Sequence, residues 1–135
     1  MNSENFRAPV IDLPYVKIKY EEPIVYFEYK KDIELGFPEI RELISCAEIL
    51  SNQKPYVTFA DVRENVNITN EGKRILEDMK NMPFFRGTAV LVDNSIYKHA
   101  ANFLSYYNKP KYPFRAFTSK DEAIQWLLSL SLDLK

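Results

Sequence analysis

The segment Tyr56–Gly72, YVTFADVRENVNITNEG, decides how the rest of the chain is interpreted. It begins with a short apolar run, Tyr56–Ala60, that stops at Asp61. A run with so few polar positions predicts a central parallel strand that is buried on both faces. Thr69 then serves as the N-cap of a helix, and Gly72 lies at the start of that helix. In an open α/β sheet, ligands, phosphates and partners usually bind at such a junction of strand, loop and helix.

A second strand and helix follow this junction. The run Gly87–Val92 predicts another central strand, Asp93 ends it, and Asn94 and Ser95 start a helix. The apolar residues of this helix recur at helical spacing and predict a packed face. That face consists of Ile96, Ala100, Phe103, Leu104 and Tyr107, while Lys98, Asn102 and Ser105 are expected to face away.

The C-terminal segment predicts one more strand and helix. Phe114–Phe117 is a short apolar run that is typical of a last strand. Ser119 and Glu122 have the spacing of a capping box, which predicts a helix start. The helix that follows has an apolar stripe of Ala123, Ile124, Trp126, Leu127 and Leu130.

The N-terminal half predicts a hairpin followed by a helix. Tyr15–Tyr20 alternates apolar and polar residues, as a half-buried strand does, and Ile24–Tyr29 is a second β-rich run. A short turn between them favours an antiparallel hairpin. Phe37–Leu50 has apolar residues at helical spacing. Residues 1–12 are expected to form an N-terminal tail that lies against the sheet edge.

The resulting order ββαβαβαβα predicts an α/β fold with four helices. Alternation of strands and helices implies right-handed crossovers and a mostly parallel sheet, to which the hairpin adds an antiparallel edge. With 135 residues, the chain suits one domain, which we place at residues 13–131.

Composition excludes several classes of function. The net charge is −1, and no basic stripe is present, so we expect no nucleic-acid binding. One Cys and one His cannot build a His/Cys zinc site or a disulfide within the chain. No motif calls for a cofactor or metal. No signal peptide or transmembrane segment is predicted, so the expected compartment is the cytoplasm.

Three segments carry a resemblance to a known family. They are VTFADV with the loop and helix that follow it, AVLVDNSIYKHAANFL, and FRAFTSKDEAIQWLLSL. Together with the element order, they resemble the STAS domain of the SpoIIAA-like anti-sigma-factor antagonists, and they are similar to uncharacterised bacterial STAS/SEC14-like proteins. The resemblance implies a SpoIIAA-like fold and regulation through protein–protein contacts.

The chain departs from this family at the regulatory motif. The antagonists carry an Asp-Ser-Ser-Gly type motif, with a phosphorylated serine, where this chain reads Asn67–Gly72, NITNEG. Thr69 is the only hydroxyl there, so it is the candidate phosphoacceptor, but a plain N-cap explains it without further assumption and is the favoured interpretation. Gly72 corresponds to the family's glycine, which lets the helix start pack closely. We therefore expect no serine phosphoswitch.

Polar side chains at the ends of the central strands form the candidate site for a partner or ligand. These are Asp61, Arg63, Thr69, Asp93, Ser95 and Lys98. The alternative is that the two aspartates cap turns and the cations are solvated. Two carboxylates could also form an acid–base pair or a magnesium site, which is the weakest hypothesis because no nucleophile motif or phosphate loop accompanies them.

Three functional hypotheses follow. The first is a regulatory protein–protein interaction module that lacks the serine phosphoswitch, and the second is a small-ligand or lipid-binding domain with an apolar cleft between sheet and helices. An enzyme, such as a hydrolase or metal-dependent enzyme, ranks third.

Some apolar residues lie off the predicted stripes or at their edge. If they cluster on the surface, they would mark a partner or homodimer surface. These residues are Ile49, Tyr106, Leu128 and Leu132.

Overall fold

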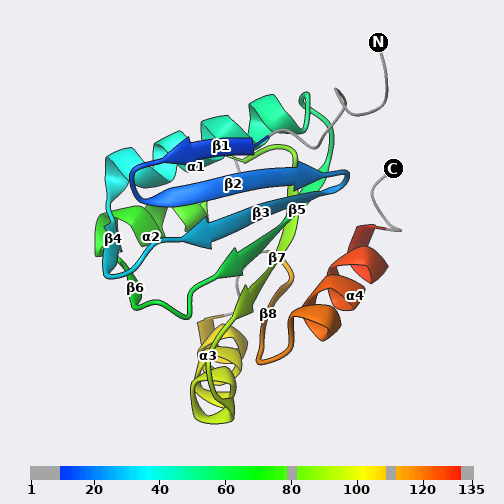
Figure 1. Cartoon of the computed structure of the whole chain (residues 1–135). Helices are drawn as coiled ribbons and strands as arrows, with labels where there is room; N and C mark the ends of the chain where they lie inside the picture. Colours follow the sequence, from blue (N-terminus) through cyan, green and yellow to red (C-terminus); the bar gives the residue numbers. More distant parts are fainter. Residues whose placement is uncertain (1–9, 79–81, 109–111, 132–135) are drawn as a thin grey trace.

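The computed structural model describes residues 10–78, 82–108 and 112–131, with side chains at 10–78, 82–102 and 112–130. Its main sheet has six strands in the order β1-β2-β3-β5-β7-β8 (Figure 1). These are β1 (Val10–Leu13), β2 (Val16–Glu21), β3 (Ile24–Tyr29), β5 (Tyr56–Asp61), β7 (Phe85–Leu91) and β8 (Phe114–Phe117). Pairing is antiparallel from β1 to β3 and parallel from β3 to β8. The predicted mixed, mostly parallel sheet is confirmed.

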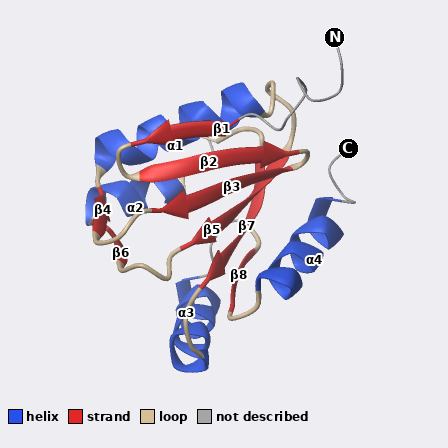
Figure 2. Ribbon diagram, in the orientation of Figure 1, coloured by secondary structure: helices blue, strands red, loops and turns tan. Residues whose placement is uncertain are grey.

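Helices cover both faces of this sheet (Figure 2). They are α1 (Phe37–Leu50), α2 (Asn70–Glu77), α3 (Ser95–Asn108) and α4 (Lys120–Ser131). The helices α1 and α2 pack on each other and on one face, which we call the α1/α2 face. Helix α4 packs on the opposite face, the α4 face, against β5, β7 and β8. Each predicted strand and helix is present, and three short strands are added: β1, β4 (Ile33–Leu35) and β6 (Val66–Ile68).

Strand β1 forms one edge of the sheet. It comes partly from the segment expected as a tail, because Val10–Asp12 pair with β2. In β2, Val16 and Ile18 are fully buried while Lys17 and Lys19 are exposed, as the alternating pattern predicts. The edge therefore starts within the predicted tail, and residues 1–9 lie outside the described residues.

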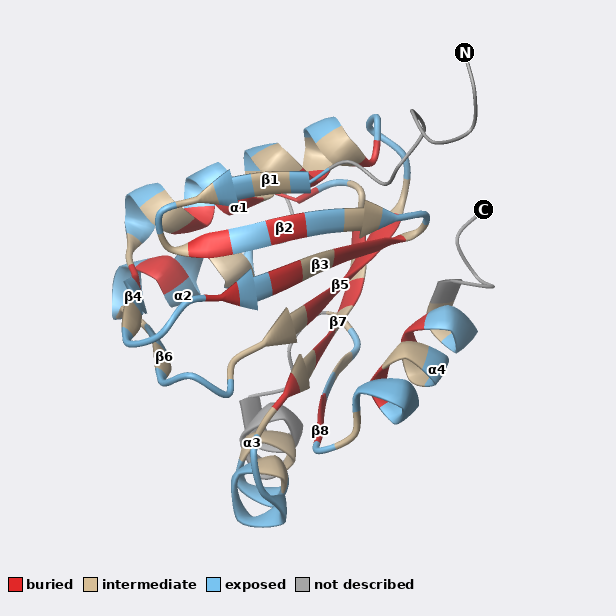
Figure 3. Ribbon diagram, viewed as in Figure 1, coloured by how far each residue is buried: buried red, intermediate tan, exposed pale blue. Residues whose placement is uncertain are grey.

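Strand β5 lies in the middle of the sheet and is buried on both faces, as predicted. Tyr56, Val57, Thr58 and Phe59 are each less than a tenth exposed (Figure 3). Tyr56 and Thr58 point to the α1/α2 face, and Val57 and Phe59 point to the α4 face, because successive side chains alternate.

The strands β4 and β6 form a separate two-stranded parallel sheet that the sequence pattern does not predict. Asp32 and Asn65 precede these strands with positive φ angles of 57° and 62°, and the Asn65 side chain donates a hydrogen bond of 2.9 Å to Asp32 Oδ1. A strand of three residues is too short to show a two-residue alternation. The pairing of β4 with β6 depends on the tertiary structure, which brings the segments before α1 and α2 together.

Gly72 lets α2 approach this small sheet. A Cβ atom at Gly72 would lie 3.0 Å from the Leu35 carbonyl oxygen and 3.1 Å from Ile40 Cγ1. These contacts are tighter than most Cβ contacts, so a larger residue would force the first turn of α2 or its neighbours in β4 and α1 to shift. This geometry agrees with the close packing expected of Gly72 from its sequence context.

Helix α3 differs from the prediction in the face that it packs. It lies against β8, and Asn102 points to the sheet: its Oδ1 accepts from Ala116 N at 2.8 Å and its Nδ2 donates to Ala116 O at 3.4 Å. Ile96 is 78% exposed and Ala100 is also exposed, so the predicted apolar face is wrong for these two residues. The outer edge of β8 needs hydrogen-bond partners, and a side-chain amide supplies both a donor and an acceptor. The side chains of Phe103, Leu104, Ser105 and Tyr107 lie outside the described side chains.

Candidate functional site

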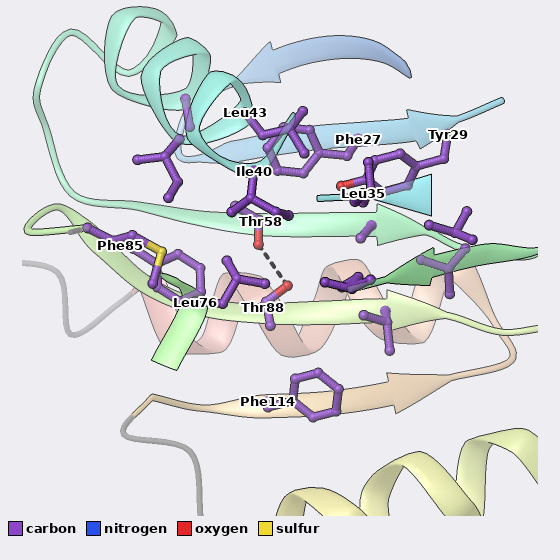
Figure 4. A pocket seen from close by; sticks show the side chains of 18 of the residues that line it. Phe27, Tyr29, Leu35, Ile40, Leu43, Thr58, Leu76, Phe85, Thr88 and Phe114 are labelled. Atoms are coloured by element: carbon purple, nitrogen blue, oxygen red, sulfur yellow. Dashed lines mark hydrogen bonds between the residues drawn. The ribbon is translucent and has the colours of Figure 1, made fainter. Parts of the chain in front are cut away.

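A cavity of about 150 Å³ lies between the sheet and the helices α1 and α2 (Figure 4). Its deep part is closed by well-buried side chains from β4, α1, β5 and β7: Leu35, Ile40, Leu43, Ala47, Tyr56 and Phe85. Its rim consists of half-buried side chains, which are Ala60, Val62, Val66, Ile68, Val90 and Phe114. Because the rim is half-buried, the cavity communicates with solvent.

The rim exists because no described helix covers the α1/α2 face over β7 and β8. Buried residues of α1 and α2 pack with residues of β2, β3 and β5, while α3 packs against β8. As a result β7 alternates between buried and half-buried side chains, and Thr88 and Val90 are the half-buried ones on this face. The sequence predicts β7 as a central strand, but only its α4 face is fully covered.

The cavity lining is apolar and carries no ionisable acid or base apart from tyrosine hydroxyls. None of the described lining residues is Asp, Glu, Lys, Arg, His or Cys. The polar atoms in the lining belong to two threonines and three tyrosines, Thr58, Thr88, Tyr29, Tyr56 and Tyr112. Burial raises the pKa of the Tyr29 phenol well above its ordinary value, so this group stays neutral.

Two threonines on neighbouring strands face each other on the cavity floor. Thr58 Oγ1 of β5 donates to Thr88 Oγ1 of β7 at 2.7 Å, and the two residues are register partners in the parallel pair (Figure 4). Sequence reasoning did not single them out. The available signal was that each is the one polar residue in an otherwise apolar run, Tyr56–Ala60 and Gly87–Val92.

The predicted residues Asp61 and Arg63 form an ion pair at the end of β5. Arg63 Nε and Nη2 donate to the two Asp61 carboxylate oxygens at 2.9 and 2.7 Å. Partial burial raises the pKa of Asp61, but the hydrogen bonds and the charge of Arg63 outweigh it, so the pKa lies below its ordinary value. The hydrogen bond and charge of Asp61 raise the pKa of Arg63. Each group thus holds the other in its charged form.

This ion pair borders a second hollow, of about 100 Å³, on the α4 face. The hollow lies over β2, β3 and β5, next to the first residue of α4. Three lysines surround it: Lys17, Lys19 and Lys120. Lys120 Nζ lies 5.9 Å from the ring centroids of both Tyr26 and Phe59, which lie in adjacent strands. Glu28 and Asp61 are also in the lining, so acidic groups offset part of the positive charge. The hollow therefore combines side chains of both charges with the aromatic rings of Tyr26 and Phe59.

Thr69 caps α2, as predicted. Its Oγ1 accepts a hydrogen bond from Gly72 N at 3.1 Å, and its backbone N donates to Leu35 O at 2.9 Å. Asn67, Asn70 and Glu71 around it are exposed. The geometry thus accounts for Thr69 as an N-cap, and phosphorylation there stays a prediction.

The predicted residues Asp93, Ser95 and Lys98 lie at the start of α3. Here Asn94, rather than Ser95, accepts from a backbone N–H of the first turn, that of Tyr97 at 3.1 Å, and also donates to Asp93 Oδ1 at 3.3 Å. Among the described side chains, no hydrogen bond or ion pair joins these residues to Asp61 or Arg63. No described cluster of three or more His, Cys, Asp or Glu residues could hold a metal ion.

Large exposed apolar side chains among the described residues are spread over β1, α1, α3 and α4 rather than gathered in one segment. Ile49 of α1 and Leu128 of α4 are 74% and 43% exposed, and Ile96 and Tyr97 of α3 are 78% and 61% exposed. Leu132 and the side chain of Tyr106 lie outside the described residues. A homodimer surface stays a prediction.

Comparison with solved structures identifies the fold. The chain is similar to an uncharacterised protein of the DUF3478 family with a SpoIIAA-like fold from Shewanella loihica PV-4. The TM-score is 0.58 at 16% sequence identity, over 83% of this chain and 91% of the other. The fold is therefore SpoIIAA-like, which confirms the resemblance seen in the sequence; at this identity the likeness extends to the fold alone.

Three further findings concern curated relatives, membrane helices and the family of the chain. No curated protein matches the chain. In the part of the chain that the structure describes, no helix has the length and apolar character needed to cross a membrane. A family model for a domain of unknown function, DUF7793, matches residues 18–131, and the chain therefore belongs to this family.

Proposed function

We propose that this protein binds a small, largely apolar molecule in the cavity between the sheet and the helices α1 and α2. One observation carries the proposal: the cavity of about 150 Å³ is lined by apolar side chains and has a half-exposed rim. Small-molecule sites are typically concave and apolar, with a few placed polar groups. An apolar cavity of about this volume, engineered in another protein, binds benzene.

The lining supports binding rather than catalysis. It offers threonine and tyrosine hydroxyls but no carboxylate, imidazole, amine or thiol that would serve as a general base beside them. The two carboxylates considered for acid–base chemistry, Asp61 and Asp93, are not among the lining residues. We therefore favour a binding protein over an enzyme.

Native mass spectrometry of the protein purified from its own cells tests the proposal. A bound small molecule that is released on denaturation is the expected result. The second arm is an NMR titration with benzene, for which we expect shifts at lining residues such as Val90 and Phe114. Ala60→Leu fills the rim and should abolish these shifts, whereas Ala100→Leu, on the exposed side of α3, should leave them unchanged. Equal binding by both variants would refute the site.

A second candidate function is partner binding at the start of α2. The exposure of Asn67, Asn70 and Glu71 around the Thr69 cap favours it. If Thr69 is a switch, Thr69→Glu should change which proteins are captured from a native extract, while Thr69→Ser keeps a capping hydroxyl and should not. If both variants and the wild type capture the same proteins, the start of α2 is not a partner-binding surface controlled by Thr69.

A further inference from the structure

We propose that the ligand is a neutral molecule with one hydrogen-bonding group, which is held by the hydroxyl pair of Thr58 and Thr88 in an otherwise apolar cavity. This inference rests on the proposed function and specifies the chemical class of the ligand. It follows from the hydrogen-bond capacity of the pair and from the charge of the described lining residues.

The hydroxyl pair has unused hydrogen-bond capacity. Each threonine hydroxyl has one proton and two lone pairs, and the 2.7 Å bond between them consumes one proton and one lone pair. No described residue makes another hydrogen bond to either hydroxyl. One proton therefore remains to donate to a ligand oxygen, and lone pairs remain to accept from a ligand hydroxyl.

The hydroxyl pair of Thr58 and Thr88 lies among apolar side chains, where an unused hydrogen-bond donor is unfavourable. Thr58 is only 7% exposed, and the side chains around it on this face are apolar. A polar group that loses water without gaining a partner is unfavourable, so a fully apolar ligand would leave the remaining proton unpaired. A ligand with one oxygen at this point pairs it.

Tyr29 supplies a second hydroxyl to the same cavity. Tyr29 is 9% exposed and lines the cavity. In Figure 4 the Tyr29 ring lies over the sheet on the side of Leu35 and Ile40. This phenol gives the cavity a second polar group that can contact a ligand of partly polar character.

The charge of the lining restricts the ligand further. No described lining residue carries a positive charge that would compensate a carboxylate or phosphate. Burying an unpaired anion is far more costly than burying a neutral ketone, ester or alcohol. The described lining residues therefore favour a neutral ligand over an ionised fatty acid or a phosphorylated headgroup.

A matched pair of probes tests the inference. Cyclohexanone and methylenecyclohexane have the same shape, and differ in that an oxygen replaces a CH₂ group. We compare their dissociation constants, measured by NMR titration, between the wild type and the double variant Thr58→Val/Thr88→Val. Valine keeps the shape of threonine, and removing both hydroxyls together leaves neither unpaired. Thr118→Val, at an exposed threonine outside the lining, is the matched control.

In the double variant, we expect cyclohexanone to bind about three- to tenfold more weakly, which is the usual contribution of one hydrogen bond. Methylenecyclohexane should bind as tightly as before or more tightly, and Thr118→Val should change neither constant. If the double variant does not fold, Thr88→Val alone should lower the preference for the ketone, whereas Thr88→Ser should keep it.

The other outcomes separate the two proposals. Binding of both probes with an unchanged ratio in the valine variant would overturn the role of the hydroxyl pair while the apolar site stands. Binding of cyclohexanecarboxylate as tightly as cyclohexanone at neutral pH would overturn the requirement for a neutral ligand. If neither neutral probe binds the wild type, the proposed function itself fails, and this inference fails with it.

Discussion

The two faces of the central sheet are packed in different ways, although the same strands form both. On the α4 face, Val57, Phe59, Ala89 and Leu91 are at most 3% exposed and pack against α4. On the α1/α2 face the alternate residues of β5 and β7 line a cavity, and Thr88 and Val90 remain half-exposed. Over β5 and β7, the α4 face is a filled core, whereas the α1/α2 face leaves a cavity.

The position of α3 explains this difference. One helix, α4, covers three parallel strands on its face, because α4 follows the last strand and packs back across β7. On the other face α3 would have to cover β7 and β8, but it packs beside β8 through Asn102 and Ala116. Because α3 packs at the edge of the sheet, no helix among the described residues covers this face over β7 and β8.

The largest expected effect compares the same substitution on the two faces. Leu127→Ala, on α4 with no exposed surface, should lower the free energy of unfolding by about 3–5 kcal/mol. Leu76→Ala, at the half-buried cavity lining, should cost only about 1–2 kcal/mol because that side chain is already incompletely surrounded. Urea unfolding measures both values. Equal costs would show that the two faces are packed alike.

The second comparison inserts a larger side chain on each face. Ala89→Leu should destabilise the protein by about 1–3 kcal/mol, because Ala89 is fully buried under α4 and has no room. Ala60→Leu points into the cavity and should change the stability by less than about 1 kcal/mol. Thermal unfolding of the two variants in parallel is the measurement. A large loss in Ala60→Leu would mean that the cavity cannot accept additional atoms.

The third prediction concerns the helix that leaves the face open. Asn102→Ala removes both partners of the Ala116 backbone, which is 1% exposed, and should cost about 1–3 kcal/mol. Hydrogen exchange at the Ala116 amide should accelerate, because no other described group bonds it there. Asn67→Ala, at an exposed asparagine, is the control and should stay within about 0.5 kcal/mol of the wild type. Unchanged protection at Ala116 would contradict the proposed role of α3.

The smallest effect is the pH dependence of the Asp61–Arg63 pair. The folded-state pKa of Asp61 lies below its unfolded value of 3.8, so the pair stabilises the folded state above that pH, and the contribution is lost as the pH falls through the folded pKa. Since Arg63 is half exposed, Asp61→Asn should cost at most about 1 kcal/mol at pH 7. Unfolding at pH 7 and at pH 3 should show the difference from wild type shrinking. A constant difference would mean that another contact of Asp61 is responsible.

Local patterns predicted most of the secondary structure correctly. Ile24–Tyr29, Phe37–Leu50 and Phe114–Phe117 have the predicted bounds. The predicted cap at Thr69 is present, and Ser119 Oγ accepts from Glu122 N at 3.3 Å at the start of α4. These features succeed because hydrophobic periodicity and capping act within a few neighbouring residues.

The predicted site residues lie where the sequence places them along the chain, and the structure shows which of them are joined. Asp61 and Arg63 do pair, but Thr69 belongs to the start of α2, and Asp93, Ser95 and Lys98 belong to the start of α3. Being at the end of a strand does not fix which face of the sheet a side chain points to. In this protein the polar residues form separate local groups.

The sequence alone therefore determined the type and order of the predicted elements, the sheet with its parallel core, and the SpoIIAA-like fold, because each depends on local periodicity and chain connectivity. Only the tertiary structure decided where α3 packs, and so whether the α1/α2 face is closed. The cavity and the Thr58–Thr88 pair likewise depend on segments far apart in the chain. A cavity is the space that side chains leave unfilled, so no single segment of the sequence encodes it.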